Sequence, residues 1–300
     1  MSTPRSLILP DGVRRAVIDT DRGTFAALEA LPGTGICERQ AALLVPGYTG
    51  SKEDFLSVLR QLAAAGRRVV AIDMRGQYET PGPRHPDAYA PAALGLDIAA
   101  IITAELATGP QGVHLLGHSF GGLVARETLL AGSVRIGSLT LMSSGPAGLI
   151  GPRAAVLRRV LAAVAGLPAP RLRTEIERLW DTQLAPQASA DGTTDEVVAF
   201  LRERMLRSCP AGLRSMGQHL LAAPDRTDEL ASRSVPILVL YGEDDEAWEP
   251  AAQEEMALRL RADRVCIPGA AHAPAVEAPE TTASALTAFW NAAEARQRRP

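Results

Sequence analysis

The stretch VHLLGHSFGG, residues 113–122, decides the fold predicted for this chain of 300 residues. Its first four residues form an apolar run typical of a buried strand, and residues 120–131 follow with a helical pattern. Between them, Gly117, Ser119 and Gly121 match the pattern G-x-S-x-G, in which a serine stands on a tight turn from a strand into a helix with its hydroxyl exposed. Because a glycine-rich turn alone is weak evidence, the interpretation rests on this strand-turn-helix context.

The same alternation of apolar runs and helical patterns extends on both sides of this stretch. Residues 14–19 and 24–29 alternate weakly around a turn at 21–23, which predicts a β-hairpin. Further strands are predicted at residues 41–45, 67–73, 136–142, 235–241 and 264–267. Helices are predicted between and after them, at residues 51–65, 92–108, 251–261 and 277–296. Continuous apolar strands that alternate with helices indicate a parallel sheet covered on both faces, so the prediction is a doubly wound α/β fold.

A long helical segment interrupts this alternation. Residues 146–232 lack strand patterns and contain four helical stretches bounded by Pro or Gly, at 153–165, 172–183, 194–208 and 213–222. We therefore expect one α/β domain built from residues 1–145 and 233–300, with residues 146–232 inserted after the sixth strand. Such an insertion would cover the carboxyl ends of the strands, where parallel sheets place their functional groups.

The composition limits the partners that the chain can bind. It carries 31 basic and 34 acidic residues, a net charge of -3, and no arginine-rich face interleaved with aromatic residues, so neither nucleic acid nor membrane insertion is expected.

Cys37, Cys209 and Cys266 are too far apart for a disulfide framework or a zinc site, which suits a reducing compartment. No signal-peptide pattern and no apolar run of roughly 18 residues occurs. We expect a cytoplasmic protein without metal or cofactor, and the sequence leaves its oligomeric state open.

A serine hydroxyl is a poor nucleophile until a general base accepts its proton and a third group orients that base. His272 follows the last predicted strand, so it would lie on a loop at the carboxyl end of the sheet; His219, in the insert, is the alternative base. The acid is expected at the end of the preceding strand. Its spacing after Gly242 favours Asp245, with Asp244 as the alternative.

In this order of serine, acid and histidine, the chain resembles the α/β-hydrolase superfamily, specifically its capped members similar to small carboxylesterases and monoacylglycerol lipases. The resemblance covers nearly the whole chain outside the insert. The segments that carry it are PGYTGS (46–51), DMRG (73–76), GHSFGG (117–122), GEDD (242–245) and GAAH (269–272), together with Glu277 and Pro279-Glu280. It implies a mostly parallel sheet of about eight strands with an inserted helical cap.

The segment PGYTGS is similar to the oxyanion loop of that family, and the resemblance implies two backbone donors. They are the N–H of Tyr48 and the N–H of Phe120, two fixed dipoles that would meet the charge formed when the serine attacks. Pro46 departs from the family, which usually carries a histidine at this position, commonly with a structural role. For DMRG the resemblance implies a structural turn in which Asp73 and Arg75 pin the loop.

Together these residues predict acyl transfer. Ser119 would attack an ester, thioester or lactone carbonyl, His272 would relay the proton, and water would release the acyl-enzyme. We expect a serine esterase for small, moderately hydrophobic acyl substrates, because the insert is rich in Leu, Val and Ala and only 4% of the chain is aromatic. An acyl thioesterase or a lactonase would use the same three side chains.

The insert supplies candidates for the substrate pocket. Leu157, Leu161 and Trp180 are the apolar side chains proposed to line it, although apolar residues at helical spacing first of all predict contacts between helices. Three acidic residues of the insert keep open a peptidase similar to proline iminopeptidases, which would bind a substrate amine: Glu175, Glu177 and Asp181. A non-catalytic ligand-binding protein with this fold is the remaining alternative.

Overall fold

The computed structural model describes residues 2–33, 37, 39–106 and 111–297. Its strands form one sheet in the order β1-β2-β4-β3-β5-β6-β7-β8, in which β1 and β4 pair antiparallel with β2 and all other neighbours pair parallel. The strands are β1 (Val13–Thr20), β2 (Gly23–Ala30), β3 (Ala42–Val45), β4 (Val69–Ile72), β5 (Val113–His118), β6 (Ile136–Met142), β7 (Ile237–Gly242) and β8 (Asp263–Ile267). The predicted eight-stranded, mostly parallel sheet is confirmed.

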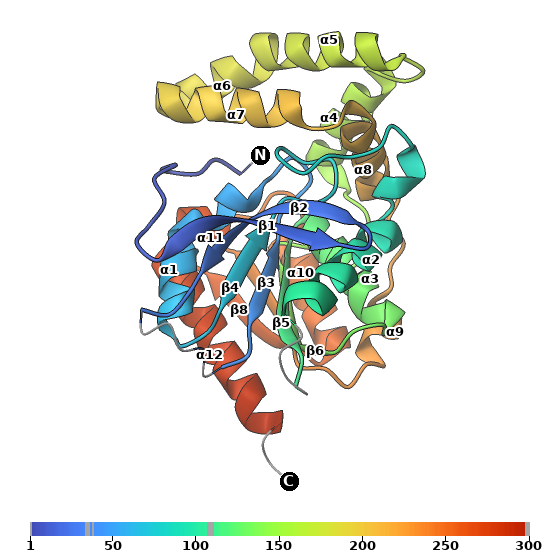
Figure 1. Ribbon diagram of the computed structural model, residues 1–300. Helices are drawn as coiled ribbons and strands as arrows, with labels where there is room; N and C mark the ends of the chain where they lie inside the picture. The colour runs from blue at the N-terminus through green and yellow to red at the C-terminus, as the bar shows by residue number, and fades with distance from the viewer. Residues whose placement is uncertain (1, 34–36, 38, 107–110, 298–300) are drawn as a thin grey trace.

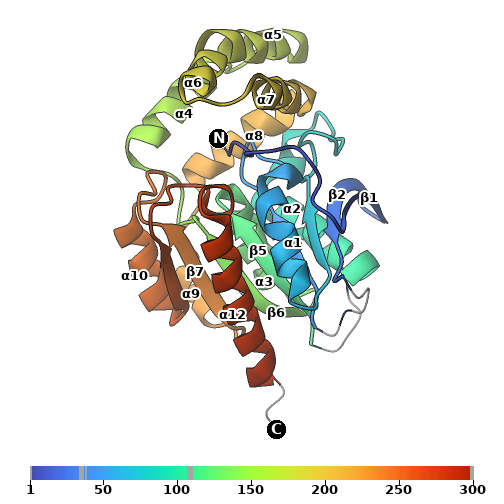
Figure 2. The same cartoon turned by 90° about the vertical axis from the view of Figure 1, so that its left-hand side faces the viewer.

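Helices cover both faces of the sheet (Figure 1). One face carries α1 (Leu56–Ala64) and α12 (Pro279–Gln297), which lie side by side (Figure 2). The other carries α2 (Pro91–Ile101), α3 (Phe120–Ala131) and α10 (Pro250–Leu260). Shorter turns of helix complete this part of the chain: η1 (Lys52–Phe55), η2 (Pro86–Tyr89), η3 (Ile102–Leu106) and α11 (Pro274–Glu277). Residues 107 and 108, the end of a predicted helix, lie outside the described residues.

The continuous apolar runs of the central strands follow from this two-faced covering. Successive side chains of a strand point to opposite faces, so Leu43 and Leu115 join the core under α2 and α3, while Leu44 and Leu116 join the core under α1 and α12. All four are fully buried. A strand that is buried on both sides cannot show the polar-apolar alternation of a surface strand.

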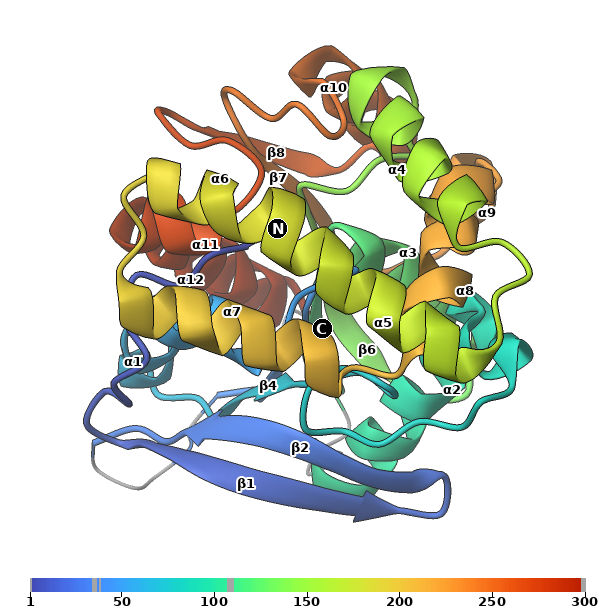
Figure 3. The ribbon, with the colours of Figure 1, turned by 90° about the horizontal axis from the view of Figure 1, so that it is seen from above.

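Between β6 and β7 the chain forms helices, and the described residues of this segment contain no strand. Figure 3 shows α5 and α7 side by side above the sheet. The helices are α4 (Gly151–Ala163), α5 (Ala169–Leu179), η4 (Trp180–Leu184), α6 (Ala185–Ala190), α7 (Asp195–Arg207), α8 (Pro210–Ala222) and α9 (Thr227–Ala231). Of these, α9 packs against α3 and α10 beside the sheet. The helices above the sheet are thus α4 to α8, and α9 lies beside the sheet.

Buried polar contacts hold this helical layer on the sheet. Arg204 of α7 donates hydrogen bonds to Asp54 Oδ1 (2.7 Å) and to the backbone oxygen of Ser2 (2.8 Å). The hydroxyl of Tyr48 donates to the backbone oxygen of Leu213 in α8 (2.7 Å). Burial raises the pKa of Asp54 to about 6, although the charge of Arg204 opposes this rise. The loop that follows β3 is thus attached to two helices of the upper layer.

In the part of the chain that the structure describes, no helix is long and apolar enough to span a membrane. The described residues also contain no group of three or more His, Cys, Asp or Glu side chains arranged to hold a metal ion.

Candidate active site

Ser119 is the single residue between β5 and α3, and its backbone conformation is strained, with φ 55° and ψ -120°. A positive φ is uncommon for a residue with a side chain and is maintained only where the surrounding structure requires it. The backbone N–H of Ser119 donates to the oxygen of Met142 in β6 (2.9 Å), which holds the turn against the neighbouring strand. The turn therefore directs the serine hydroxyl away from the backbone, as the G-x-S-x-G pattern predicts.

The two glycines of the pattern are required by close contacts of the backbone. A Cβ at position 117 would lie 2.2 Å from the oxygen of Gly121, and a Cβ at position 121 would lie 2.4 Å from the oxygen of Pro46. Both distances are far below any van der Waals contact. The glycines thus let the strand, the helix and the loop after β3 approach one another around Ser119.

Two hydrogen bonds connect Ser119 to residues that follow β7 and β8. His272 Nε2 lies 3.0 Å from Ser119 Oγ, and His272 Nδ1 lies 2.9 Å from Asp245 Oδ1. The carboxylate of Asp245 is buried and also accepts hydrogen bonds from the backbone N–H of Ala247 (2.9 Å) and from Gln253 Nε2 (3.0 Å). The structure thus brings the three side chains singled out in the sequence into one chain of hydrogen bonds.

The electrostatics of Asp245 determine which nitrogen of His272 carries the proton. Burial alone would raise the pKa of Asp245, but the hydrogen bonds and the charge around it, chiefly those of His272, lower the pKa below its ordinary value. An ionised carboxylate can only accept, so His272 Nδ1 donates to it and Nε2 is left to accept the hydroxyl proton of Ser119. This is the arrangement that a general base requires.

The alternatives left open by the sequence occupy other places. Asp244 is exposed, and its backbone N–H donates to the oxygen of Ala270. His219 lies on α8, half-buried, and makes no hydrogen bond to Ser119. The geometry therefore favours Asp245 and His272 over these two residues.

The loop after β3 lies directly beside the serine. A Cβ at Gly47 would approach the Cβ of Ser119 to 3.2 Å, so the peptide between Gly47 and Tyr48 is a neighbour of the reacting hydroxyl. Phe120, the other expected donor, is the first residue of α3, where backbone N–H groups have no partner within the helix. Both N–H groups thus belong to segments that border Ser119, as an oxyanion hole requires.

His118, which directly precedes Ser119 in the sequence, packs against the ring of His272, with the two ring centroids 5.1 Å apart. Its Nε2 lies 2.7 Å from the backbone oxygen of His272, and because a carbonyl oxygen only accepts, this nitrogen must carry a proton. Burial, together with the nearby His272, lowers the pKa of His118 to about 3. A neutral His118 therefore fixes the backbone of the loop that carries the base, a contact that no local sequence pattern indicates.

The lowered pKa predicts a pH dependence of folding. Between about pH 6.5 and pH 3 the unfolded chain binds a proton at His118 that the folded chain does not, so stability falls as the pH falls through this window. In His118→Gln this proton uptake is absent. The slope of the free energy of unfolding against pH should therefore be smaller than in wild type in this window, by about 1.4 kcal/mol per pH unit. Urea unfolding at several pH values checks this, with His85→Gln, at an exposed position, as the control. Equal slopes for wild type and His118→Gln would contradict it.

The DMRG turn has structural partners. Asp73 accepts hydrogen bonds from the backbone N–H and from the ammonium group of Lys52, both at 2.8 Å. Arg75 forms a bidentate ion pair with Asp97, at 2.6 and 2.7 Å. Neither side chain contacts Ser119 in the described structure, so the turn after β4 is held to its neighbours in the way the resemblance implies.

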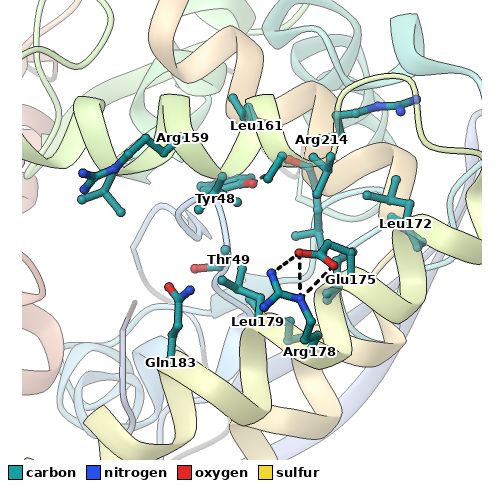
Figure 4. A pocket seen from close by; sticks show the side chains of 18 residues that line it. Tyr48, Thr49, Arg159, Leu161, Leu172, Glu175, Arg178, Leu179, Gln183 and Arg214 are labelled. Carbon is teal, nitrogen blue, oxygen red and sulfur yellow. Dashed lines mark hydrogen bonds and ion pairs between the residues drawn. The ribbon is translucent and has the colours of Figure 1, made fainter.

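A cavity of about 350 Å³ lies between the loop after β3 and helices α4, α5 and α8 (Figure 4). Ser119 is not part of its wall, but Tyr48 and Thr49, from the loop beside the serine, are. Most of the other lining side chains are aliphatic, and the polar ones are Arg159, Glu175, Arg178, Gln183 and Arg214. Glu175 forms hydrogen bonds with Arg178 at 3.0 and 3.1 Å.

Of the three apolar residues expected to line a pocket, Leu161 does so. Leu157 packs instead against the main hydrophobic core. Trp180 is completely buried, and its ring packs with Tyr78, Val197, Phe200 and Leu201 in a separate core beneath the upper layer. Leu157 and Trp180 thus fill space between packed elements and do not line this cavity.

Known proteins resemble this chain in both sequence and structure. The alpha/beta hydrolase family model matches residues 42–285. Two pimeloyl-(acyl-carrier protein) methyl ester esterases are similar: that of Aeromonas salmonicida is 30% identical over 74% of this chain and 84% of its own, and that of Aeromonas hydrophila is 29% identical over 72% and 82%. A thermophilic esterase from Thermogutta terrifontis, solved with malate bound, is 26% identical, covers 93% of this chain and 99% of its own, and has a TM-score of 0.68. These matches confirm the resemblance drawn from the motifs: the chain belongs to the alpha/beta hydrolase family.

Proposed function

We propose that this protein hydrolyses carboxylic esters by acyl transfer to Ser119. The observation that carries the proposal is the continuous relay from Asp245 through His272 to Ser119, with hydrogen bonds of 2.9 and 3.0 Å. Each of the three residues follows a different strand of the parallel sheet, at the carboxyl end where such sheets place reacting groups. The esterases named above, to which the chain is similar, support the same chemistry.

The geometry supports a two-step reaction. As Ser119 Oγ forms a bond with the ester carbonyl carbon, His272 Nε2 accepts the hydroxyl proton, and the ionised Asp245 stabilises the imidazolium. The N–H groups of Tyr48 and Phe120 would hold the oxyanion of the tetrahedral intermediate. The alcohol leaves with the proton from His272, and water, activated by the same histidine, then releases the acid and restores Ser119.

The cavity beside Tyr48 supports a small acyl substrate of moderate hydrophobicity. Its walls are largely aliphatic, and about 350 Å³ is enough space for a short chain and not for a macromolecule. The two similar Aeromonas proteins are named for the methyl ester of a pimeloyl group on an acyl-carrier protein, which supports an ester of an acyl chain as the bond that is cleaved. A thioester or a lactone would react through the same groups, so a panel of acyl esters, acyl thioesters and lactones of graded chain length is needed to rank the three.

The peptidase alternative finds little support in the cavity. A substrate ammonium group would need an unpaired carboxylate, but Glu175, the acidic side chain in the lining, already binds Arg178. Glu177 and Asp181 do not line the cavity. An ester, which carries no such charge, fits these walls better.

The test of the proposal is labelling of Ser119 with a fluorophosphonate probe. Wild type should be labelled on the peptide that contains Ser119, and Ser119→Ala should not be labelled. Ser144→Ala is the matched control, because Ser144 is also buried near a strand end and its hydroxyl has no hydrogen-bond partner. An unlabelled wild type would favour a non-catalytic binding protein, and label that persists in Ser119→Ala would place the nucleophile elsewhere.

A further inference from the structure

The loop after β3 (residues 46–51), the proposed oxyanion loop, is held in part by its own residues, since the N–H of Gly50 donates to the oxygen of Gly47 (3.1 Å). The side chain of Pro46, at the start of this loop, can neither donate nor accept a hydrogen bond. An oxyanion donor works only when its direction is fixed before the reaction, because reorientation in the transition state would cost the energy that the donor contributes. Further hydrogen bonds that fix the peptide between Gly47 and Tyr48 must therefore come from the buried neighbours of these two residues.

Gln77, which follows the DMRG turn, reaches this loop with its side-chain amide. Its Nε2 donates to the backbone oxygens of Gly47 (2.7 Å) and Tyr48 (3.2 Å). Its Oε1 accepts from the backbone N–H of Met74 (3.0 Å), and the residue is only 1% exposed. A flipped amide would turn its oxygen toward two carbonyls and its NH₂ toward an N–H, so the three partners determine the orientation of Gln77.

This contact controls the direction of an oxyanion donor through the geometry of the peptide bond. The oxygen of Gly47 and the N–H of Tyr48 belong to the same planar trans peptide and point in opposite directions. When Gln77 holds the oxygen, it also fixes the direction of the N–H on the other side of the plane. The second bond, to the oxygen of Tyr48, restrains the next peptide in the same way.

Gln77 is itself carried on a rigid turn. Its backbone N–H donates to the oxygen of Met74 (2.9 Å), and its own oxygen accepts from the N–H of Thr80 (2.8 Å). The residues on either side are bonded to the upper helical layer, Gly76 O to the N–H of Cys209 (2.8 Å) and the N–H of Tyr78 to Ser208 Oγ (3.1 Å). The amide therefore cannot follow a movement of the loop without breaking these bonds.

We propose that Gln77 is a positioning residue of the oxyanion hole, which directs the N–H of Tyr48 toward the reacting carbonyl. This inference rests on the proposed function of Ser119. Gln77 does not touch the substrate; it acts through the loop. It should contribute to the transition state and little to binding of the ground state, because the charge on the oxyanion exists only after attack.

The test is Gln77→Met, which keeps the length of the side chain and removes all three hydrogen bonds. Removal of an oxyanion donor itself costs about 10²- to 10³-fold in kcat, so loss of its aim should lower kcat on the order of 10- to 100-fold. KM for a p-nitrophenyl ester should stay within about three-fold of wild type. Affinity for an alkyl boronic acid, which forms a tetrahedral adduct with the serine, should fall in parallel with kcat.

The matched control is Gln40→Met. Gln40 Nε2 also donates two hydrogen bonds, to Gln111 (3.0 Å) and Gln297 (2.7 Å), at a position that makes no contact with the Ser119 turn. Gln77→Met loses three hydrogen bonds and Gln40→Met loses two, so a purely structural role of Gln77 predicts lower thermal stability and unchanged kcat in both variants. A kcat of Gln77→Met within about two-fold of wild type, or a rise in KM alone, would overturn the inference.

A second variant guards against a failure to fold. Gln77→Leu also removes the amide donor and introduces no buried charge, so the same loss of kcat is expected, and wild-type kcat would overturn the inference. Fluorophosphonate labelling separates this outcome from failure of the proposed function. If wild type is unlabelled, the proposed function fails; if wild type and both variants are labelled and kcat is unchanged, only the role of Gln77 fails.

Discussion

Replacing Asp245 with asparagine should lower kcat for ester hydrolysis on the order of 10⁴-fold. All three partners of this carboxylate are donors: His272 Nδ1, the N–H of Ala247 and Gln253 Nε2. Either orientation of an asparagine amide therefore turns its NH₂ group toward a donor. The negative charge that stabilises the imidazolium of His272 is lost in both orientations, and in one of them Nδ1 also loses the acceptor that keeps its proton in place.

Asp244→Asn is the control for this prediction. The neighbouring carboxyl group is exposed and makes no contact with His272, so its replacement should leave kcat within about two-fold of wild type. Steady-state kinetics with a p-nitrophenyl ester, together with circular dichroism to confirm folding, provides the measurement. If Asp244→Asn loses more activity than Asp245→Asn, the acid has been assigned to the wrong residue.

Replacing Lys52 with methionine should lower the free energy of unfolding by about 3–5 kcal/mol. This lysine is the only one in the chain, it is 1% exposed, and its ammonium group contacts three carboxylates. The distances are 2.8 Å to Asp73, 3.0 Å to Glu53 and 2.6 Å to Glu79. Without the lysine, Glu53 keeps only a longer contact to Arg15 (3.9 Å), and the described residues form no other ion pair with Asp73. A buried charge that loses its partner is costly.

Arg264→Met supplies the comparison for Lys52→Met. Arg264 pairs with Glu254 at 3.3 Å, but both side chains are close to half exposed, and a pair in water contributes about 1 kcal/mol or less. Urea or guanidinium unfolding near neutral pH measures both variants. A loss for Lys52→Met no greater than that for Arg264→Met would show that the buried cluster does not depend on its cation.

The regular elements of the sheet were largely predictable because their signal is local. The run at 136–142 and the helix at 120–131 have the same bounds in the structure as in the prediction. The short helices α6 and α9 were not predicted. Each has at most six residues, which is too few for a helical period to emerge from the sequence.

The residues of the candidate site also differ in how far local sequence predicts them. Ser119 carries a local signal, because the glycines around it are required by contacts within one strand-turn-helix unit. The choice between Asp244 and Asp245 depends on how the loop after β7 turns, and the position in the chain only favours one of them. Trp180 shows most clearly what a sequence pattern cannot predict. An apolar residue at helical spacing has the same pattern whether it faces a cavity or another helix.

By itself, the sequence determined the order of strands and helices, the turn that carries Ser119 and the presence of a histidine and an acid after later strands, because each depends on residues close together in the chain. Only the tertiary structure decided that Gln77 holds the peptide of Gly47 and that His118 holds the loop of His272. Both are contacts between side chains and distant backbone groups. The packing of the whole chain sets which side chain meets which carbonyl, and no periodicity in the sequence records it.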